Sequence, residues 1–519
     1  MKSLSLIIII TFFSAAVFAQ AGELDSSFGT YGKVIIHNGP HWIGPESIAI
    51  QPDGKIVTAG VSFNGANNDF GLLRFKSNGA LDSSFGIDGK VITAIGVLDE
   101  AYAVAIQPDG KIIAAGQSSP GFAVARYNTD GALDATFGNN GIVTTGGIGS
   151  GGGIAFSVAI QPNSKIVAAG VANNGFNVDF ALVRYNTNGA LDSSFGTNGK
   201  VTTDFGLSDD WAFAVTVQPD GKIIEAGYSS NLMMYQTYFS LIRYNTDGTL
   251  DSTFGTYGKV LTTIGSSDDE EAYSVAIQSD GKIVEAGYCW NGTTIDFGLV
   301  RYTTEGVPDS SFGINGKVIT AIGSGDDRAS SVAIQLDDKI VASGYSISNT
   351  LDADFALVRY NKDGTLDNSF GSGGKVTSDF DSSQDWGTHM TIQPDGKIVM
   401  AGSSLAALDT FSASIALARY LSGLNVGILN FSSCPSSPLI YPNPIHQTET
   451  LEFTLTKNES LTIALYDVNG KLVRNFISNE QRTAGAHKEI LSIGELTSGN
   501  YFLTLSNGSE KMTVKMMKQ

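Results

Sequence analysis

The chain has 519 residues and a formal net charge of −19, and its length allows more than one domain. The acidic balance excludes an ordinary nucleic-acid-binding protein, which needs clustered Lys and Arg, and argues against adhesion to anionic lipid. Two cysteines, Cys289 and Cys434, are too few for a disulfide framework in an exported chain of this size. The sequence leaves open whether they form one long-range bridge or remain two thiols.

Residues 1–19 have the pattern of a secretory signal peptide. Lys2 supplies the positive charge, an apolar run follows over residues 6–13, and Val17-Phe18-Ala19 forms a cleavage site. The run is too short to cross a bilayer comfortably, and no later stretch is long and apolar enough. We therefore expect export without membrane insertion; an uncleaved anchor is the alternative.

Residues 24–420 contain seven copies of one pattern. It reads L-D-S-S-F-G-x-x-G-K-V, then an apolar run with A-I-Q-P-D-G-K-I-V-x-A-G, then D-F-A-L-V-R-Y. A period in the fifties with several short apolar runs indicates a repeat built from strands. In the third copy we predict strands over 157–160, 165–170, 180–185 and 200–203. Four antiparallel strands repeated radially describe a propeller blade.

The two ends of the repeat array are complementary. It begins with a fourth-strand phrase at residues 32–36 and ends with strands one to three of a seventh copy at residues 390–420. We predict an all-β chain with a seven-bladed β-propeller over residues 20–423, made of four-stranded blades and closed by the N-terminal strand. An open solenoid would need capping units, and the sequence has none that we recognise.

Each repeat carries one Arg that closes the third strand and one Asp in the L-D-S-S-F-G phrase. A catalytic residue is normally needed once, so two residue types present seven times are predicted to be architectural. We expect them to pair within each blade, because a buried guanidinium needs a fixed carboxylate or several carbonyls. The residues are Arg74, Arg126, Arg184, Arg243, Arg301, Arg359 and Arg419, with Asp25, Asp82, Asp134, Asp192, Asp251, Asp309 and Asp367.

The two repeated phrases L-D-S-S-F-G-x-x-G-K-V and Q-P-D-G-K-I resemble those of the delta-60 repeat family of bacterial exported proteins. The resemblance extends over residues 24–420. It implies a β-propeller-like array and supplies no catalytic residues.

The chain changes character after residue 423. A linker rich in Pro and Ser at 424–438 precedes Y-P-N-P (441–444), L-Y-D-V-N-G-K (465–471) and L-T-S-G-N-Y-F (496–502). Alternating strands with Asn-Gly and Ser-Gly turns predict a small Ig-like β-sandwich over 439–519. The motifs resemble the type A sorting domain of the type IX secretion system of Bacteroidota. That resemblance implies recognition by the type IX secretion machinery and a secreted or surface-attached product; an adhesive sandwich is the alternative.

The loops between blades are predicted to form an acidic rim. Loops that vary between repeats on a rigid scaffold are where binding usually resides. Carboxylate oxygens at this rim suit calcium, or a cationic or polyhydroxylated ligand, and aromatic residues lie beside them in the sequence. The alternative is that the acids keep an exported protein soluble, while the aromatic rings pack against the first strands of the blades. The candidate residues are Asp99, Glu100, Tyr102, Asp209, Asp210, Trp211, Asp269, Glu270, Tyr273, Asp326, Asp327, Asp385 and Trp386.

Candidates for catalysis are few. His37, His41 and His389 flank the predicted closure seam, where a cluster would supply a general base or a metal site. We found no nucleophile elbow, HExxH helix, phosphate loop or dinucleotide fingerprint. The favoured hypothesis is a secreted or cell-surface propeller that binds a glycan or a protein through its acidic rim. A hydrolase or lyase acting on polysaccharide or peptide, and a purely structural surface component, remain as alternatives.

Overall fold

The computed structural model describes residues 20–37, 43–119, 121–206, 208–231, 233, 236–265, 269–348, 352–380, 384–405, 414–423, 439–441, 448–467, 472–493, 496, 499–507 and 511–518. The chain divides into two compact units, Met1–Ser422 and Gly423–Gln519. The described residues form strands and turns without a helix. None of them therefore makes a helix that is long and apolar enough to cross a membrane. The predicted signal peptide, the linker at 424–438, His41 and Cys434 lie outside the described residues.

The strands of the first unit are β1 (Lys33–Ile36), β2 (Ile43–Ile50), β3 (Ile56–Phe63), β4 (Asn68–Phe75), β5 (Lys90–Thr93), β6 (Asp99–Ile106), β7 (Ile112–Ser118), β8 (Gly121–Tyr127), β9 (Ile142–Thr145), β10 (Gly153–Ile160), β11 (Ile166–Asn173), β12 (Val178–Tyr185), β13 (Lys200–Thr203), β14 (Asp210–Val217), β15 (Ile223–Asn231), β16 (Gln236–Tyr244), β17 (Lys259–Thr262), β18 (Glu270–Ile277), β19 (Ile283–Trp290), β20 (Ile295–Tyr302), β21 (Lys317–Thr320), β22 (Asp327–Ile334), β23 (Ile340–Ile347), β24 (Ala353–Tyr360), β25 (Lys375–Ser378), β26 (Gln384–Ile392), β27 (Ile398–Leu405) and β28 (Ser414–Tyr420). Those of the second unit are β29 (Leu439–Tyr441), β30 (Thr448–Leu455), β31 (Glu459–Asp467), β32 (Leu472–Arg482), β33 (Gly485–Ser492), β34 (Gly499–Ser506) and β35 (Lys511–Lys518).

Six blades of four antiparallel strands follow one another along the chain: β2–β5, β6–β9, β10–β13, β14–β17, β18–β21 and β22–β25. A closing sheet contains β26, β27, β28 and β1. A single parallel bridge, Ala353 to Gln384, joins this closing sheet to the sixth blade. The predicted all-β propeller of four-stranded blades is therefore confirmed, and the N-terminal strand β1 completes the last sheet by pairing with β28.

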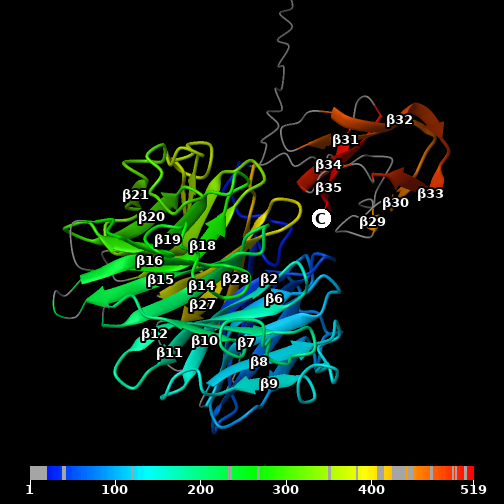
Figure 1. Cartoon of the computed structure of the whole chain (residues 1–519). Coiled ribbons are helices and arrows are strands. Elements are labelled where there is room, and N and C mark those ends of the chain that lie inside the picture. The colour runs from blue at the N-terminus through cyan, green and yellow to red at the C-terminus, as the bar shows by residue number, and fades with distance from the viewer. Residues whose placement is uncertain are drawn as a thin grey trace, which may run out of the picture. The chain divides into compact units, whose positions relative to one another are not determined.

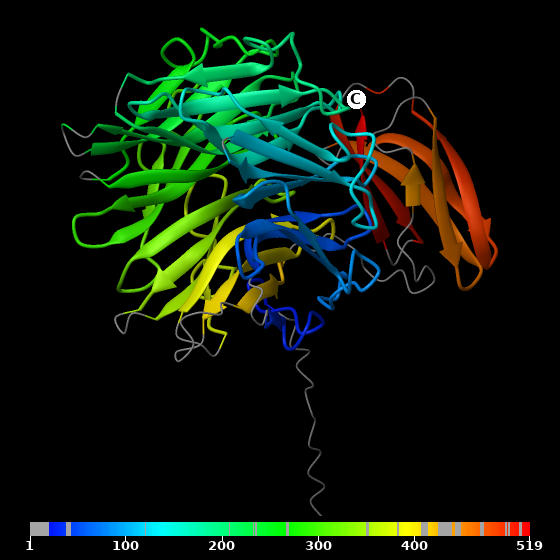
Figure 2. The same cartoon turned by 90° about the horizontal axis from the view of Figure 1, so that it is seen from below.

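In the first unit, the first strand of each sheet contacts the first strands of both neighbouring sheets. We call these strands the inner ring: β2, β6, β10, β14, β18, β22 and β26. The ring closes because β26 contacts β2. Across this seam the Thr388 hydroxyl donates to the carbonyl of Pro45 at 3.0 Å. Figures 1 and 2 show the blue strands of the first blade beside the yellow and gold strands of the closing sheet.

Blades form because the second and third strands of each repeat are apolar on both faces. In the third repeat every residue of β12 from Asp179 to Tyr185 is buried. Such strands lie between two other sheets, so hydrophobic clusters form between neighbouring blades. One cluster joins Ile113 and Val124 of the second blade to Ile166 and Ala168 of the third. The fourth strand lies where we predicted it, whereas β10 and β11 extend further, because their ladder continues to the pair Gly153 and Ala172.

An ion-pair clasp fastens each repeat near its recurring turns. Arg184 Nε donates to Asp192 Oδ2 at 2.7 Å, and Lys165 Nζ reaches the same oxygen at 2.7 Å. The guanidinium lies 4.3 Å from the ring centre of Phe195 and also donates to the carbonyl of Thr246 in the next blade at 2.5 Å. The same Arg–Asp hydrogen bond occurs in all seven repeats. The clasp therefore holds a turn and also links neighbouring blades.

The second unit consists of two sheets, β29-β30-β33 and β32-β31-β34-β35. Both contribute to one core, which includes Leu451 and Phe453 from β30, Ile463 from β31 and Leu503 from β34. Two sheets that share a core form a sandwich. In the first unit Cys289 is a free, buried thiol, and burial raises its pKa to about 12.

Candidate functional site

The inner ring carries an unusual set of side chains at the start of its strands. On β14, Asp210 and Ala212 are buried, whereas Trp211 and Phe213 are half-buried. Side chains of a strand alternate between its two faces, so the second and fourth residues of the strand share one face. The strand β18 repeats this pattern with half-buried Glu271 and Tyr273. These half-buried positions differ from blade to blade, whereas the residue between them is alanine in five of the seven sheets, with Pro45 and Gly387 in the other two.

Seven aromatic residues from the second to the fifth blade lie in a row, which we call the aromatic arc: Tyr102, Phe156, Trp211, Phe213, Tyr228, Tyr273 and Tyr288. The ring centres are 5.1 Å apart between Tyr102 and Phe156, and 5.0 Å between Phe156 and Phe213. Phe213 lies 4.8 Å from Tyr273, which is stacked on Tyr288 at 5.9 Å. All except Tyr288 are half-buried, so the arc presents part of its ring surface to solvent.

Hydrogen-bonding groups hold both ends of the arc. At one end the Glu100 carboxylate accepts hydrogen bonds from Tyr102 at 2.5 Å, Gln117 at 2.5 Å and Asn68 at 2.7 Å. At the other end Tyr273 donates to the Glu271 carboxylate. These bonds orient the phenol rings, because a short side chain-to-side chain bond restricts rotation about both side chains.

Two further charged groups lie beside the arc. The Arg328 guanidinium lies 4.3 Å from the ring centre of Tyr288, a cation–π contact. Burial, together with the nearby Glu100 charge, raises the pKa of Glu46. Beyond Arg328, the Trp386 ring lies 4.7 Å from that of Tyr345.

Five of the predicted rim acids are buried, and each accepts backbone amides of the loop that precedes it. Asp99, for example, accepts from Ile95 at 2.6 Å and from Gly96 at 2.9 Å. These contacts are local side chain-to-backbone caps, and they shape the connection between blades. The five are Asp99, Asp210, Glu270, Asp327 and Asp385.

The remaining predicted residues divide between scaffold and arc. Asp209 and Asp326 accept the amides of Val178 and Ile295, which begin third strands of the preceding blades. Asp269 is exposed. Glu100, Tyr102, Trp211 and Tyr273 belong to the arc or bond to it, and Trp386 lies in the neighbouring pair with Tyr345.

The sequence reasoning missed several residues that complete this surface: Glu46, Phe156, Phe213, Tyr228, Tyr288, Arg328 and Tyr345. The available signal was the alternation after the rim acid, where every second residue of the inner strand differs between repeats.

The predicted histidine cluster does not form among the described residues. His37 follows β1, the outermost strand of the closing sheet, and its Nδ1 lies 2.9 Å from Ser414 Oγ. His389 lies on β26, the innermost strand of the same sheet, where burial lowers its pKa to about 4. The two strands are separated by β27 and β28, which explains why these histidines are apart.

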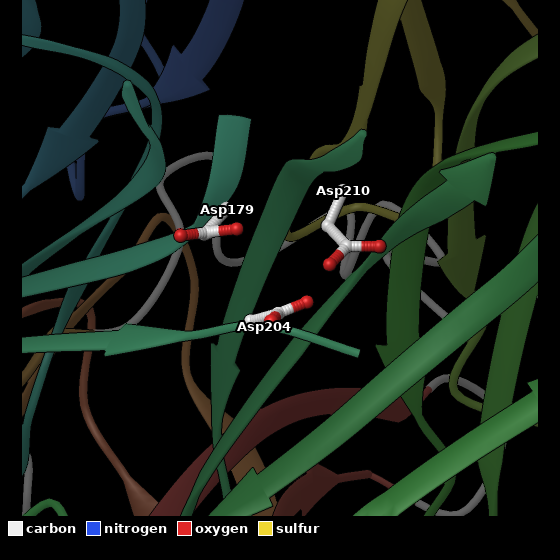
Figure 3. A group of neighbouring side chains, drawn as sticks. All are labelled: Asp179, Asp204 and Asp210. Carbon is white, nitrogen blue, oxygen red and sulfur yellow. The ribbon is translucent and has the colours of Figure 1, made fainter. Parts of the chain in front are cut away.

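Carboxylates also gather at two junctions between blades. Oxygen atoms of Asp179, Asp204 and Asp210 lie within 4.8 Å of one another, and those of Asp354, Asp379 and Asp385 do the same. Figure 3 shows the first group facing a common space. Burial raises the pKa of Asp210 to about 6, and the charges of Asp204 and Asp179 add to the shift. These two groups are the described places with three clustered metal-ligating side chains.

The comparisons with known families match both units. Residues 51–85, 107–137, 161–195, 218–254, 278–312 and 335–370 match the family "Domain of unknown function (DUF5122) beta-propeller". Residues 439–519 match the family "Secretion system C-terminal sorting domain". Both expected resemblances, to a propeller repeat and to a sorting tail, are confirmed. No curated protein sequence matches the chain.

Several solved structures are similar to this chain at low identity. A fungal alcohol oxidase of the AA5 family, in complex with copper, has 12% identity over 94% of this chain and 98% of that chain, with a TM-score of 0.46. Sqt1 from Chaetomium thermophilum has 11% identity over 76% and 98%, with a TM-score of 0.40. The β-propeller domain of the Trilobed protease from Pyrococcus furiosus has 11% identity over 73% and 93%, with a TM-score of 0.39. Likeness at this level carries no argument about function.

Proposed function

We propose that this chain, which carries DUF5122 beta-propeller repeats and ends in a secretion system sorting domain, binds glycans through the aromatic arc. The sorting domain makes it a secreted or outer-surface protein that interacts with the type IX secretion machinery. Its ligand is therefore an extracellular one.

The observation that carries the proposal is the continuity of partly exposed rings on one side of the inner ring. A role in packing alone would favour aromatic residues in every repeat. Instead, the position occupied by Phe213 and Tyr273 holds Ser330 in the sixth blade and Thr388 in the closing sheet. A run of partly exposed rings with a few convergent polar groups is typical of a ligand-binding surface.

The chemistry of the arc suits a polyhydroxylated ligand. Ring faces pack against the C–H surfaces of a sugar ring, while the hydroxyl oxygens of Tyr102 and Tyr273, which donate to Glu100 and Glu271, can still accept hydrogen bonds. The carboxylates of Glu100 and Glu271 accept hydrogen bonds from hydroxyl groups, and the Arg328 guanidinium donates them. The half-exposed rings thus supply contact area, and the polar groups at the ends of the arc supply orientation.

A glycan array probed with the full-length mature protein tests the proposal. The Phe213→Ser variant replaces the ring with the residue that the sixth blade has at the equivalent position, so we expect the fold to tolerate it. We expect selective binding by the wild-type protein and at least a tenfold loss of affinity in F213S. Phe176→Ala is the control, because Phe176 is fully exposed outside the arc. A blank array, or equal binding by F213S, would reject the proposal in favour of a protein partner.

One observation favours a second candidate function, cleavage of the bound glycan. Glu46 has a raised pKa beside the Glu100 carboxylate. A carboxyl group with a raised pKa close to a second carboxyl group is the arrangement that most glycoside hydrolases use. Glu46→Gln should then abolish turnover of an array-positive glycan while its binding persists. Absence of turnover by the wild-type protein would leave binding as the sole function.

A further inference from the structure

The three carboxylates in Figure 3 come from three different segments at the junction of the third and fourth blades. Asp179 lies on β12, Asp204 lies in the connection after β13, and Asp210 is the first residue of β14. One oxygen of each lies within 4.8 Å of the others. The fold therefore brings together acids that are up to 31 residues apart in sequence.

Two of these acids are removed from water. Asp210 is fully buried and Asp179 has 7% of its surface exposed. Buried carboxylates close together repel one another unless a cation or several donors compensate them. The amino group of Lys259 donates to the backbone carbonyl of Asp204 at 2.5 Å, and no salt bridge to the three carboxylates is found among the described residues.

A second observation points to a ligand in the space between them. Asp179 Oδ2 accepts a hydrogen bond from Asn174 at 2.9 Å, but Asp179 Oδ1 and the fully buried Asp210 Oδ1 have no hydrogen-bond partner among the described residues. Figure 3 shows a carboxylate oxygen of Asp179 directed toward Asp210 and Asp204. Buried acceptors without a partner are rare in native proteins, and a cation held between the three carboxylates would compensate the buried oxygens of Asp179 and Asp210.

The fifth blade shows that the fold does not require the third carboxylate. There Asp296 and Asp327 occupy the positions of Asp179 and Asp210, while Ala321 stands where Asp204 would be. Lys375 still donates to the backbone carbonyl at this position, at 2.6 Å. The lysine contact is thus independent of the carboxylate, and Asp204 adds negative charge that the scaffold does not need.

We propose that Asp179, Asp204 and Asp210 bind a calcium ion that ties the third blade to the fourth. Carboxylate oxygens are the preferred ligands of this hard cation, which takes six to eight of them in flexible geometry. Asp204 is exposed, so water has access to the remaining coordination positions. The ion would stabilise the start of β14, the strand that carries Trp211 and Phe213, but the proposal does not depend on glycan binding.

The test is calcium titration calorimetry, together with thermal unfolding, on the full-length mature protein after treatment with a chelator. We expect the wild-type protein to bind calcium and to gain thermal stability from it, with magnesium less effective. Asp204→Ala copies the fifth blade, so it should fold normally in chelator. Its calcium affinity should fall at least tenfold, and calcium should no longer raise its melting temperature.

Asp379→Ala, in the second carboxylate group, is the matched control and should retain the calcium-dependent gain that D204A loses. Absence of calcium binding by the wild-type protein would overturn the proposal. Equal binding by D204A, or a loss confined to D379A, would overturn it as well. If D204A fails to fold in chelator, Asp204→Asn removes the charge while keeping the shape, and the same outcomes apply.

Discussion

Arg419 Nε donates to Asp25 Oδ2 at 2.8 Å across 394 residues of sequence. The six other Arg–Asp pairs have the same geometry but join residues only eight positions apart. Lys397 Nζ lies 2.9 Å from the same Asp25 oxygen, and the guanidinium of Arg419 lies 4.6 Å from the ring centre of Phe28. The closure of the propeller therefore uses the contact that fastens every other repeat.

The first prediction concerns this clasp. Arg184→Met should destabilise the protein by about 1–3 kcal/mol, because the buried Asp192 carboxylate loses its guanidinium partner but keeps Lys165. Chemical denaturation of the wild-type and variant proteins measures the difference. Removing the exposed side chain of Lys362 is the control, because only the backbone carbonyl of Lys362 belongs to a clasp, that of Arg301. An unchanged midpoint in Arg184→Met would refute the structural role.

The second prediction concerns acid. Although burial alone would raise it, hydrogen bonds from Ser27 and Lys397 and the charge of Arg419 lower the pKa of Asp25 to about 2. A carboxyl with a depressed folded-state pKa stabilises the fold above its ordinary pKa near 4, and this stabilisation is lost as the pH falls toward 2. We expect the melting temperature to fall steeply between about pH 4 and pH 2. Asp25→Asn should be less stable at pH 7 and show a shallower acid transition; parallel curves would contradict this account.

The third prediction concerns the pH range from about 4.5 to 8. Glu225 is fully buried on β15, and its carboxyl accepts a hydrogen bond from Tyr244 at 3.1 Å. Burial raises the pKa of Glu225 to about 8. The folded state therefore holds a proton that the unfolded chain loses near pH 4.5, so stability falls as the pH rises from about 4.5 to 8, by about 1.4 kcal/mol per pH unit at most.

Glu225→Gln removes this ionisation while keeping the shape of the side chain. We expect the variant to be more stable than the wild-type protein at pH 8 and to have a flatter pH profile above pH 5. Unfolding followed by circular dichroism over this pH range provides the measurement. Glu305→Gln, at an exposed turn, should leave the profile as it is. A Glu225→Gln profile identical to that of the wild-type protein would show that Glu225 is not the group responsible.

The fourth prediction links the scaffold to the arc. A Cβ on Gly227 would lie 1.8 Å from the backbone oxygen of Trp211, whereas one on Gly298 would meet Cys289 Sγ at 3.3 Å. Gly227→Ala should therefore displace the inner strand, cost about 1–3 kcal/mol and weaken ligand binding. Gly298→Ala matches Ala181 of the third blade and should change neither property by much. Comparable effects of the two substitutions would contradict this explanation.

The fold could be predicted from the sequence because the same pattern of strands and turns recurs in seven repeats. The fourth strand of the third repeat, over residues 200–203, lies where the K-V-T-T phrase placed it. The complementary ends of the array predicted the pairing of β1 with β28. Strand ends at the variable loops were less accurate, since backbone pairing continues there without an apolar pattern in the sequence.

The site was only partly predictable because the charge pattern does not reveal which carboxylates bond to their own backbone. Asp99 and Asp210 looked like free rim acids, yet both accept amides of their own loops. Asp204 could have been found from the sequence, since D-F follows the fourth strand only at Asp204-Phe205 and Asp379-Phe380. Its position beside Asp179 depends on the pairing of β12 with β13, which only the three-dimensional structure supplies.

The strand β1 is far in sequence from β28, its partner in the closing sheet, so the β1 strand of a second molecule can take its place. Lys33 to Ile36 pair with Ala418 to Ile415 through backbone contacts that a second copy of the chain could supply in the same register. A chain that lacks β1 would leave β28 as an open sheet edge, with its unpaired amides and carbonyls exposed. The expected misassembly of such chains is pairing between two open β28 edges, which β1 prevents in the intact protein.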